Sequence, residues 1–178
     1  MLSSLAIWSA SLGCGGRPEP APPAPVPVQA PPPTPGPTVP SRVSVRAAAS
    51  ITDSIFALTN RERVRADLTP LRRSADLSRA AQVQAEQMAS AQKLAHDLPG
   101  SRYPSLVSRL RLVKYTSSAS GENIAEGYTS GAALVAGWMT STTHKANILS
   151  ARYTETGVGS ARSKAGRTYH AQVFARRR

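Results

Sequence analysis

The sequence predicts a mixed α+β domain, and two kinds of hydrophobic spacing carry that prediction. Stretches 51–66 and 76–91 place apolar residues three and four positions apart, which is the spacing of a helix that buries one face. Stretches 156–163 and 167–175 alternate around Lys164-Ala165-Gly166, which is typical of a β-hairpin with one solvent-exposed face. The chain has 178 residues, and the part after its proline-rich stretch suits one domain that needs no disulfide.

Residues 1–16 are predicted to be a signal or lipobox-like segment. They begin with an apolar run that is too short to span a bilayer and that suits the end of a secretory signal. Ser11-Leu12-Gly13-Cys14 resembles a bacterial lipobox, in which the cysteine is lipidated and becomes the mature N-terminus. The alternatives are an ordinary signal end or an apolar tail with an incidental thiol. We favour lipidation of Cys14, because a short apolar run is otherwise a weak anchor.

Residues 17–49 are predicted to be a disordered, proline-rich linker. The stretch 17–40 holds 12 of the 15 prolines of the chain. Because proline fixes φ and lacks an amide donor, neither a helix nor an internal strand can form there. An extended spacer of about 3.1 Å per residue would hold a globular head away from a membrane. A ligand for proline-binding modules is the weaker alternative, since the stretch carries little sign of an anchoring side-chain pattern.

The globular head, residues 50–178, is predicted to begin with two helices. Ser50 and Asp53 form a capping-box-like start for the first helix. Asp76 is expected to cap the second, alanine-rich helix, which ends shortly before His96.

The rest of the head is predicted to alternate short helices, loops and strands. In order, we expect a short helix over 103–113, a serine-rich loop over 114–121, an extended or turn segment over 122–128, a helix over 131–140, a tight passage over 143–149, and then the hairpin.

The head carries all of the excess positive charge. The chain has 22 Lys+Arg against 10 Asp+Glu, a net charge of +12, and the two charges that precede Ser41 cancel. Such a field attracts nucleic acid, anionic lipid or acidic glycans without choosing among them. No RNA-reading aromatic signature accompanies the charge. The arginine-rich runs 61–65 and 109–111 are predicted to be solvated helix faces.

Three titratable side chains are the candidate site residues: His96, Glu122 and His144. Polar groups are costly to bury unpaired, so their position in apolar, glycine-punctuated sequence indicates a cleft. Two imidazoles and a carboxylate suit Zn²⁺ or a similar divalent ion; they equally suit proton transfer, with Glu122 orienting a histidine. Spacing does not choose between these, and each residue alone also suits a structural role such as a helix cap.

Short motifs in a fixed order identify a family resemblance that spans about residues 50 to 175. They are Leu58-Thr59-Asn60 with Arg63, Pro70-Leu71, Leu77 with Ala80-Ala81, His96, Arg109-Leu110, Gly121-Glu122-Asn123-Ile124-Ala125, Trp138-Met139 with Ser141 and His144, Asn147-Ile148-Leu149, Gly157-Val158-Gly159, and Gln172-Val173-Phe174. Together they resemble the domain of cysteine-rich secretory proteins, antigen 5 and pathogenesis-related-one proteins (the CAP superfamily, or SCP domain), in a cysteine-poor bacterial form.

This resemblance implies a three-layer α-β-α sandwich with a small antiparallel sheet flanked by helices. It also implies a cavity with two histidines and two acidic residues, three of which His96, Glu122 and His144 match. The resemblance, rather than the spacing, brings these three side chains together as catalytic or metal-binding residues.

The second acidic residue of that cavity has no counterpart here. It should follow Trp138, where Thr140 and Ser141 stand instead, and its loss should weaken metal binding. Glu126 is a candidate to replace the missing carboxylate. The alternative is that Glu126 is an ordinary surface charge. His170 is expected to be structural or exposed.

Three functions remain open from the sequence. The first is a secreted or lipid-anchored cell-envelope binding module, whose cleft takes a lipid, glycan or peptide and holds a divalent metal. The second is a metal-assisted hydrolase or protease with Glu122 as base. The third, ranked last, is a basic nucleic-acid binder. No nucleophile elbow, Walker loop or close Cys-His pairing is present, so serine, cysteine and phosphoryl-transfer chemistry have no support.

Overall fold

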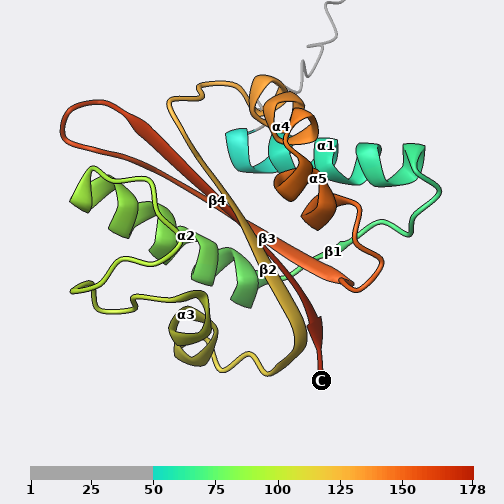
Figure 1. Ribbon diagram of the computed structural model, residues 1–178, viewed down its shortest axis with the longest axis horizontal. Coiled ribbons are helices and arrows are strands. Elements are labelled where there is room, and N and C mark those ends of the chain that lie inside the picture. The colour runs from blue at the N-terminus through green and yellow to red at the C-terminus, as the bar shows by residue number, and fades with distance from the viewer. Residues whose placement is uncertain (1–49) are drawn as a thin grey trace, which may run out of the picture. The chain divides into compact units, whose positions relative to one another are not determined.

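The computed structural model describes residues 50–178, so the predictions for Cys14 and for the proline-rich linker lie outside the described residues. The elements of this part follow the order shown in Figure 1: α1 (Ile51–Arg65), β1 (Arg72–Arg73), α2 (Ala75–Ala91), α3 (Leu106–Leu112), β2 (Ser117–Glu126), α4 (Gly131–Thr140), α5 (Thr142–Ile148), β3 (Glu155–Arg162) and β4 (Thr168–Arg177). None of the helices within residues 50–178 has the length and apolar character needed to cross a membrane.

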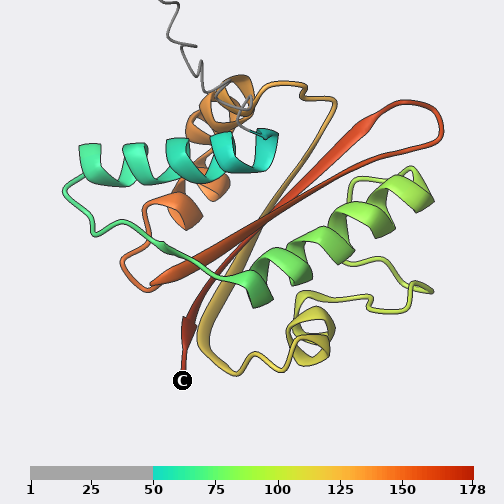
Figure 2. The ribbon, with the colours of Figure 1, turned by 180° about the vertical axis from the view of Figure 1, so that it is seen from behind.

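The sheet separates two layers of helices. Its strand order is β1-β3-β4-β2, with the three long strands antiparallel and the two-residue β1 parallel to β3. Helices α2 and α3 cover one face, and α1, α4 and α5 cover the other, as the two opposite views show (Figures 1 and 2). The α+β, three-layer prediction is confirmed, and the short β1 makes the sheet mixed rather than purely antiparallel.

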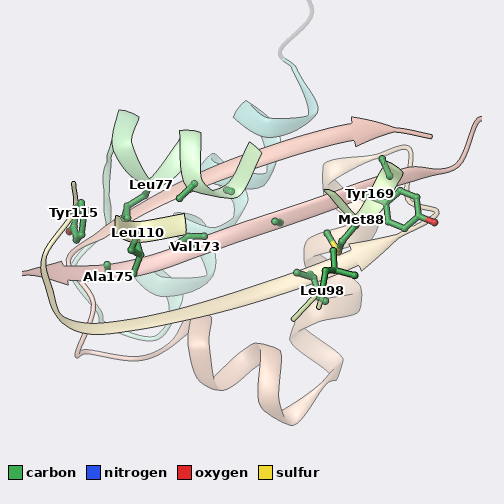
Figure 3. Packing of buried hydrophobic residues seen from close by; sticks show 13 residues of the cluster. Leu77, Met88, Leu98, Leu110, Tyr115, Tyr169, Val173 and Ala175 are labelled. Atoms are coloured by element: carbon green, nitrogen blue, oxygen red, sulfur yellow. The ribbon is translucent and has the colours of Figure 1, made fainter. Parts of the chain in front are cut away.

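Each face of the sheet has its own hydrophobic core. Between α2, α3 and the sheet, Leu77, Met88 and Leu110 pack against Val173 and Tyr169 of β4 (Figure 3). On the other face, Phe174 of β4 packs in a cluster with residues of α1, α4 and α5. Neighbouring β4 residues thus enter opposite cores, as the period of two along a strand requires.

The prediction of one solvent-exposed strand face is therefore wrong for β4. Residues 169–175 are all buried, including the polar side chains of His170 and Gln172. The reason is topological: β4 lies between β3 and β2, and helices cover both of its faces. The polar residues that suggested exposure are hydrogen-bonded instead, as when Gln172 donates to the hydroxyl of Thr156 at 3.2 Å.

Gly157 and Gly159 allow α2 to lie directly on β3. A Cβ atom at Gly157 would overlap the backbone of Leu77 and Ser78, and one at Gly159 would overlap the backbone of α2 one turn later. The Gly157-Val158-Gly159 motif therefore has a packing role, since only glycine tolerates so close an approach of two backbones.

Several element boundaries differ from the predicted ones. The serine-rich stretch predicted as a loop forms the first half of β2, because pairing with β4 overrides the weak strand propensity of serine. The passage after α4 is a short helix, α5. Ser74, not Asp76, caps α2 by accepting a hydrogen bond from the Leu77 amide, and Asp76 pairs with Arg177 at 2.8 Å.

The two arginine-rich runs are only partly solvated, contrary to prediction. Arg63 is 2% exposed and Arg109 is 0% exposed, whereas Arg61, Arg65 and Arg111 are exposed. Both buried arginines lie on the inner face of their helices, where backbone carbonyls accept their hydrogen bonds. Composition alone cannot distinguish such a residue from its solvated neighbours.

Candidate functional site

Glu122 is the centre of the candidate site. It lies in β2 opposite Val173 of β4, with its side chain only 3% exposed. Oε2 accepts a hydrogen bond from Nη2 of Arg109 at 2.8 Å, and Oε1 lies 3.0 Å from Nδ1 of His96. Both carboxylate oxygens are thus engaged by groups that carry or can carry positive charge, which makes burial of this anion tolerable.

His96 lies at the solvent boundary of the site. Its side chain is 56% exposed although its Nδ1 atom contacts the buried carboxylate. The hydrogen bond with Glu122 raises the pKa of the imidazole, against the opposing effects of burial and of the Arg109 charge. The bond to Glu122 leaves Nε2 as the ring nitrogen that is not engaged within residues 50–178.

The backbone around His96 is fixed in place, which positions its ring. Nε2 of Gln84, a buried residue of α2, donates to the carbonyls of Ala95 at 2.6 Å and of His96 at 3.1 Å. Arg109 also donates to the His96 carbonyl, at 3.4 Å. The connection after α2 is therefore tied to α2 and to α3 at the residue that carries the imidazole.

His144 belongs to the same neighbourhood but makes no bond to Glu122. It lies in α5, half-buried, with its ring centroid 6.2 Å from that of Trp138. Burial lowers the pKa of its imidazole, and the positive charge of His96 lowers it further. The two imidazoles are thus close enough to influence one another electrostatically, and of the two only that of His96 contacts Glu122.

Asn123 and Asn147 connect α5 to β2. Asn123 donates to the His144 carbonyl at 3.0 Å, and Asn147 donates to the Glu122 carbonyl at 3.2 Å and to Oδ1 of Asn123 at 2.9 Å. Both asparagines thus brace the backbone of the site.

The outward carbonyls of β2 accept side-chain donors at every second residue. Ser120 accepts from the hydroxyl of Tyr153 at 3.3 Å, and Ile124 accepts from the indole of Trp138 at 3.3 Å. Together with the bond from Asn147 to Glu122, these fix the strand that carries the carboxylate. Trp138 is 2% exposed and belongs to the hydrophobic core between the sheet and α1, α4 and α5.

The other side chains named from the sequence have local roles. Glu126 pairs with Arg167 at 2.8 Å. Its carboxylate is therefore engaged in an ion pair and is not a free acid at the site. Ser141 is the residue between α4 and α5, with its hydroxyl 3.3 Å from that of Thr143. His170 is 0% exposed, with Nδ1 3.0 Å from the Ser160 hydroxyl and Nε2 2.8 Å from the Tyr128 carbonyl, so it is structural.

Arg109 is the site residue that the sequence analysis did not identify. Its guanidinium is fully buried and its Nε atom has no hydrogen-bond partner within the described chain. One signal was present: Leu106, Arg109, Leu110 and Val113 recur at helical spacing, so Arg109 stands in the apolar stripe of α3. An arginine in such a stripe needs a buried acceptor, and Glu122 supplies it.

The side chains at the site leave few ligand atoms available for a divalent metal. Among residues 50–178, no group of three or more His, Cys, Asp or Glu side chains is arranged to hold one. Glu122 has both oxygens engaged, one of them by the permanent charge of Arg109. As arranged, the residues do not fit a metal that uses the carboxylate as a direct ligand. The imidazoles of His96 and His144 are the remaining candidate ligands, and Glu122 is bonded to Nδ1 of His96.

Comparison with known proteins identifies the family. A model of the cysteine-rich secretory protein family (CAP) matches residues 56–174. The uncharacterized protein YkwD of Bacillus subtilis is 31% identical over 122 residues, which are 68% of this chain and 45% of the relative. The uncharacterized membrane protein YlbC of the same organism is 33% identical over 123 residues, which are 69% of this chain and 34% of the relative. The chain thus spans less than half the length of either relative.

Solved structures agree in fold. An extracellular protein of Bacillus anthracis that contains an SCP domain aligns with a TM-score of 0.64 and 30% identity, covering 71% of this chain and 40% of that one. An outer surface protein of Borrelia burgdorferi aligns with a TM-score of 0.62 and 18% identity over 70% of this chain and 90% of that one, a likeness of fold alone. With its matched motifs, its three-layer architecture and these relatives, the chain belongs to the cysteine-rich secretory protein (CAP) family.

Proposed function

We propose that this domain is an extracellular binding module of the cell envelope that recognises an acidic group of its ligand through the imidazoles of His96 and His144. The extracellular setting is inferred from the Bacillus anthracis relative, which its description calls extracellular. Lipidation of Cys14 and a spacer over residues 17–49 belong to this proposal and would tether the domain to a membrane.

The observation that carries the proposal is the arrangement around Glu122. Arg109 lies 2.8 Å from the buried carboxylate of Glu122 and neutralises its charge. Protonation of His96 therefore adds a net positive charge, and apart from Glu122 no acidic side chain within residues 50–178 contacts it. That charge lies at the surface, on a side chain that is 56% exposed. Nε2–H of His96 is then a donor for a carboxylate or phosphate oxygen, as charge-assisted hydrogen bonds require.

The charge of the whole chain favours the same class of ligand. A net charge of +12 raises the local concentration of anionic lipids and acidic glycans near the domain. The positive field attracts anionic ligands over a distance, and the two imidazoles provide the specific contact. Together these would select a ligand by its charge.

A divalent metal at the imidazole pair is an extension of this proposal. His96 and His144 would hold it, and it would supply Lewis acidity and an additional positive charge for an anionic ligand. Glu122 would keep Nδ1 of His96 protonated, so that Nε2 presents its lone pair outward.

One observation also favours an acid–base hydrolase as a second candidate. A carboxylate 3.0 Å from Nδ1 orients His96 as it would orient a general base, with Nε2 free to accept a proton. Hydrolysis of ester, amide or glycosidic probes by the full chain, abolished in both Glu122→Gln and His96→Ala, would establish this candidate in place of a simple binder.

Co-sedimentation of the full chain tests the binding proposal. Insoluble peptidoglycan and phosphatidylglycerol vesicles are the probes, at about pH 6 where a raised imidazole pKa keeps His96 charged. We expect His96→Ala and His144→Ala to weaken retention by about tenfold each. Lys145→Ala is the matched control, because Lys145 is an exposed cation on α5 next to His144. Equal loss in all three variants, or retention of neither probe, would sink the proposal.

A further inference from the structure

A cavity at the end of α1 offers a second, separate site. Its volume is about 430 Å³, and it lies where the α1–β1 and α5–β3 connections meet the ends of β1 and β4. The lining includes Thr69, Ala151 and three arginines, Arg63, Arg72 and Arg176. None of the lining residues is His96, Arg109, Glu122 or His144, so this cavity is independent of the imidazole site.

Arg63 is a buried cation without an acidic partner. It is 2% exposed, and no carboxylate within residues 50–178 lies within 4.0 Å of its guanidinium. Nε donates to the Thr69 carbonyl at 3.0 Å, and Nη1 donates to the carbonyls of Ile148 and Ser150 at 2.8 Å each. Nη2 donates to no atom of the described chain. A guanidinium held rigidly by three carbonyls, with one nitrogen uncommitted, is pre-organised for an oxyanion.

Arg176, an exposed residue near the end of β4, also lines the cavity and is also held by backbone carbonyls. Nε donates to the Arg152 carbonyl at 2.8 Å and Nη2 donates to the Ala151 carbonyl at 3.1 Å, so the α5–β3 connection holds the side chain in place. No carboxylate of the described chain pairs with it, and Nη1 has no acceptor there. Two arginines anchored by carbonyls therefore line one hollow.

The charge balance of the lining is positive. Arg72 is neutralised by Glu155, whose Oε1 lies 2.7 Å from its Nη2. Asp67 is the acidic residue of the lining, and it is exposed. One carboxylate thus stands against the two unneutralised guanidinium groups of Arg63 and Arg176, and burial, which lowers the pKa of Arg63, adds to the cost of leaving that cation without a partner.

The cavity has room for more than a single ion. A second hollow of about 420 Å³ shares Ala151 and Arg176 with the first and continues along Ser118 and Arg152. Arg176 lies between the two, so a ligand can place its anion in the first hollow and extend into the second.

We propose that this arginine-lined cavity binds a phosphate-type oxyanion carried on a larger molecule, with Arg63 and Arg176 as the groups that contact it. Guanidinium forks match phosphate oxygens in geometry and charge, and the neighbouring hollow receives the attached glycerol or sugar. The site goes beyond the proposed function of the imidazole pair and does not depend on it.

Calorimetric titration of the full chain with inorganic phosphate and with glycerol 3-phosphate tests this proposal. We expect Arg176→Gln to weaken both ligands by at least about tenfold, because a charge-assisted contact is lost. Arg177→Gln is the matched control: it removes the same charge one residue away, from a side chain that pairs with Asp76 and does not line the cavity. Its effect should stay within about twofold.

Three outcomes overturn the proposal. They are no phosphate binding to the full chain, equal weakening by Arg176→Gln and Arg177→Gln, and loss of phosphate binding in the His96→Ala/His144→Ala double variant. Backbone amide shifts at Thr69 and Thr154 on phosphate addition support it, since both residues line the cavity. Phosphatidylglycerol vesicles form the last arm: Arg176-dependent retention assigns the anion to a lipid headgroup, and glycerol 3-phosphate binding without retention assigns it to a soluble or polymeric phosphate.

Discussion

Nδ1 of His96 lies 3.0 Å from Oε1 of Glu122, and the boundary between protein and solvent passes between the two side chains, which are 56% and 3% exposed. The buried carboxylate of Glu122 is thus linked to the solvent-exposed surface by the titratable imidazole of His96. Removal of one proton from the imidazole changes the charge at the surface while the carboxylate stays where Arg109 holds it.

The contact between His96 and Glu122 makes stability depend on pH. Because the pKa of His96 is raised in the folded state, its contribution is fully present below the unfolded pKa and is lost as pH rises through the folded value. We expect His96→Asn to lower the free energy of unfolding more at about pH 5.5 than at about pH 8.5, with a difference below about 1 kcal/mol because the imidazole is partly solvated. Urea unfolding at both values measures this, and an equal loss at both would contradict it.

His170 should respond to pH in the opposite direction. Burial lowers the pKa of this imidazole, so the folded state favours the neutral ring. The contribution of His170 to the free energy of unfolding is therefore fully present above the unfolded pKa. It is lost as the pH drops from about 6.5 toward the folded pKa. We expect His170→Gln to flatten that acid limb in urea unfolding curves, and an unchanged acid limb would show that another group causes it.

Arg109 should be far more important for stability than its sequence neighbour Arg111. Arg109→Leu leaves Glu122 buried beside only a partly solvated histidine, and we expect a loss of about 3–5 kcal/mol in the free energy of unfolding. Exposed Arg111→Leu should cost no more than about 0.5 kcal/mol. The double variant Arg109→Leu/Glu122→Leu should recover part of the loss, because it removes the unpaired charge. No recovery would mean that packing around Arg109, rather than charge, causes the effect.

Gly157→Ala should separate α2 from β3. The added methyl group would overlap the α2 backbone, so we expect a destabilisation of about 1–3 kcal/mol, measured as a lower midpoint of thermal or urea unfolding. Gly137→Ala is the control, because its added methyl group meets the end of the Tyr128 side chain and a helix interior favours alanine. A neutral Gly157→Ala would show that the helix can move without cost.

The sequence predicted the elements that local patterns determine. The apolar stripe and cap placed α1 to within one residue of its observed end, and α4 was predicted with its observed bounds. The serine-rich start of β2 could not be predicted in the same way, because cross-strand pairing with β4 forms it. The burial of both faces of β4 likewise follows from strand order, which local periodicity does not encode.

The candidate site was predicted through its residue types and the family resemblance, but its internal connections were not. Which oxygen of Glu122 meets which partner depends on α3, a segment whose arginines resemble surface charges in the sequence. Arg63 shows the same difficulty, since its acceptors lie on segments 6 to 87 residues away along the chain. Long-range acceptors for a buried guanidinium leave no local pattern.

The three side-chain donors along β2 have a consequence for how the protein resists aggregation. An edge strand of ten residues, paired on one side only, would ordinarily be a template on which another chain could add a strand and begin an aggregate. Here Tyr153, Asn147 and Trp138 occupy the carbonyls that such an incoming strand would need. At the opposite margin of the sheet, β1 is only two residues long. These side-chain contacts therefore disfavour the addition of a second copy of the chain along the outer edge of β2.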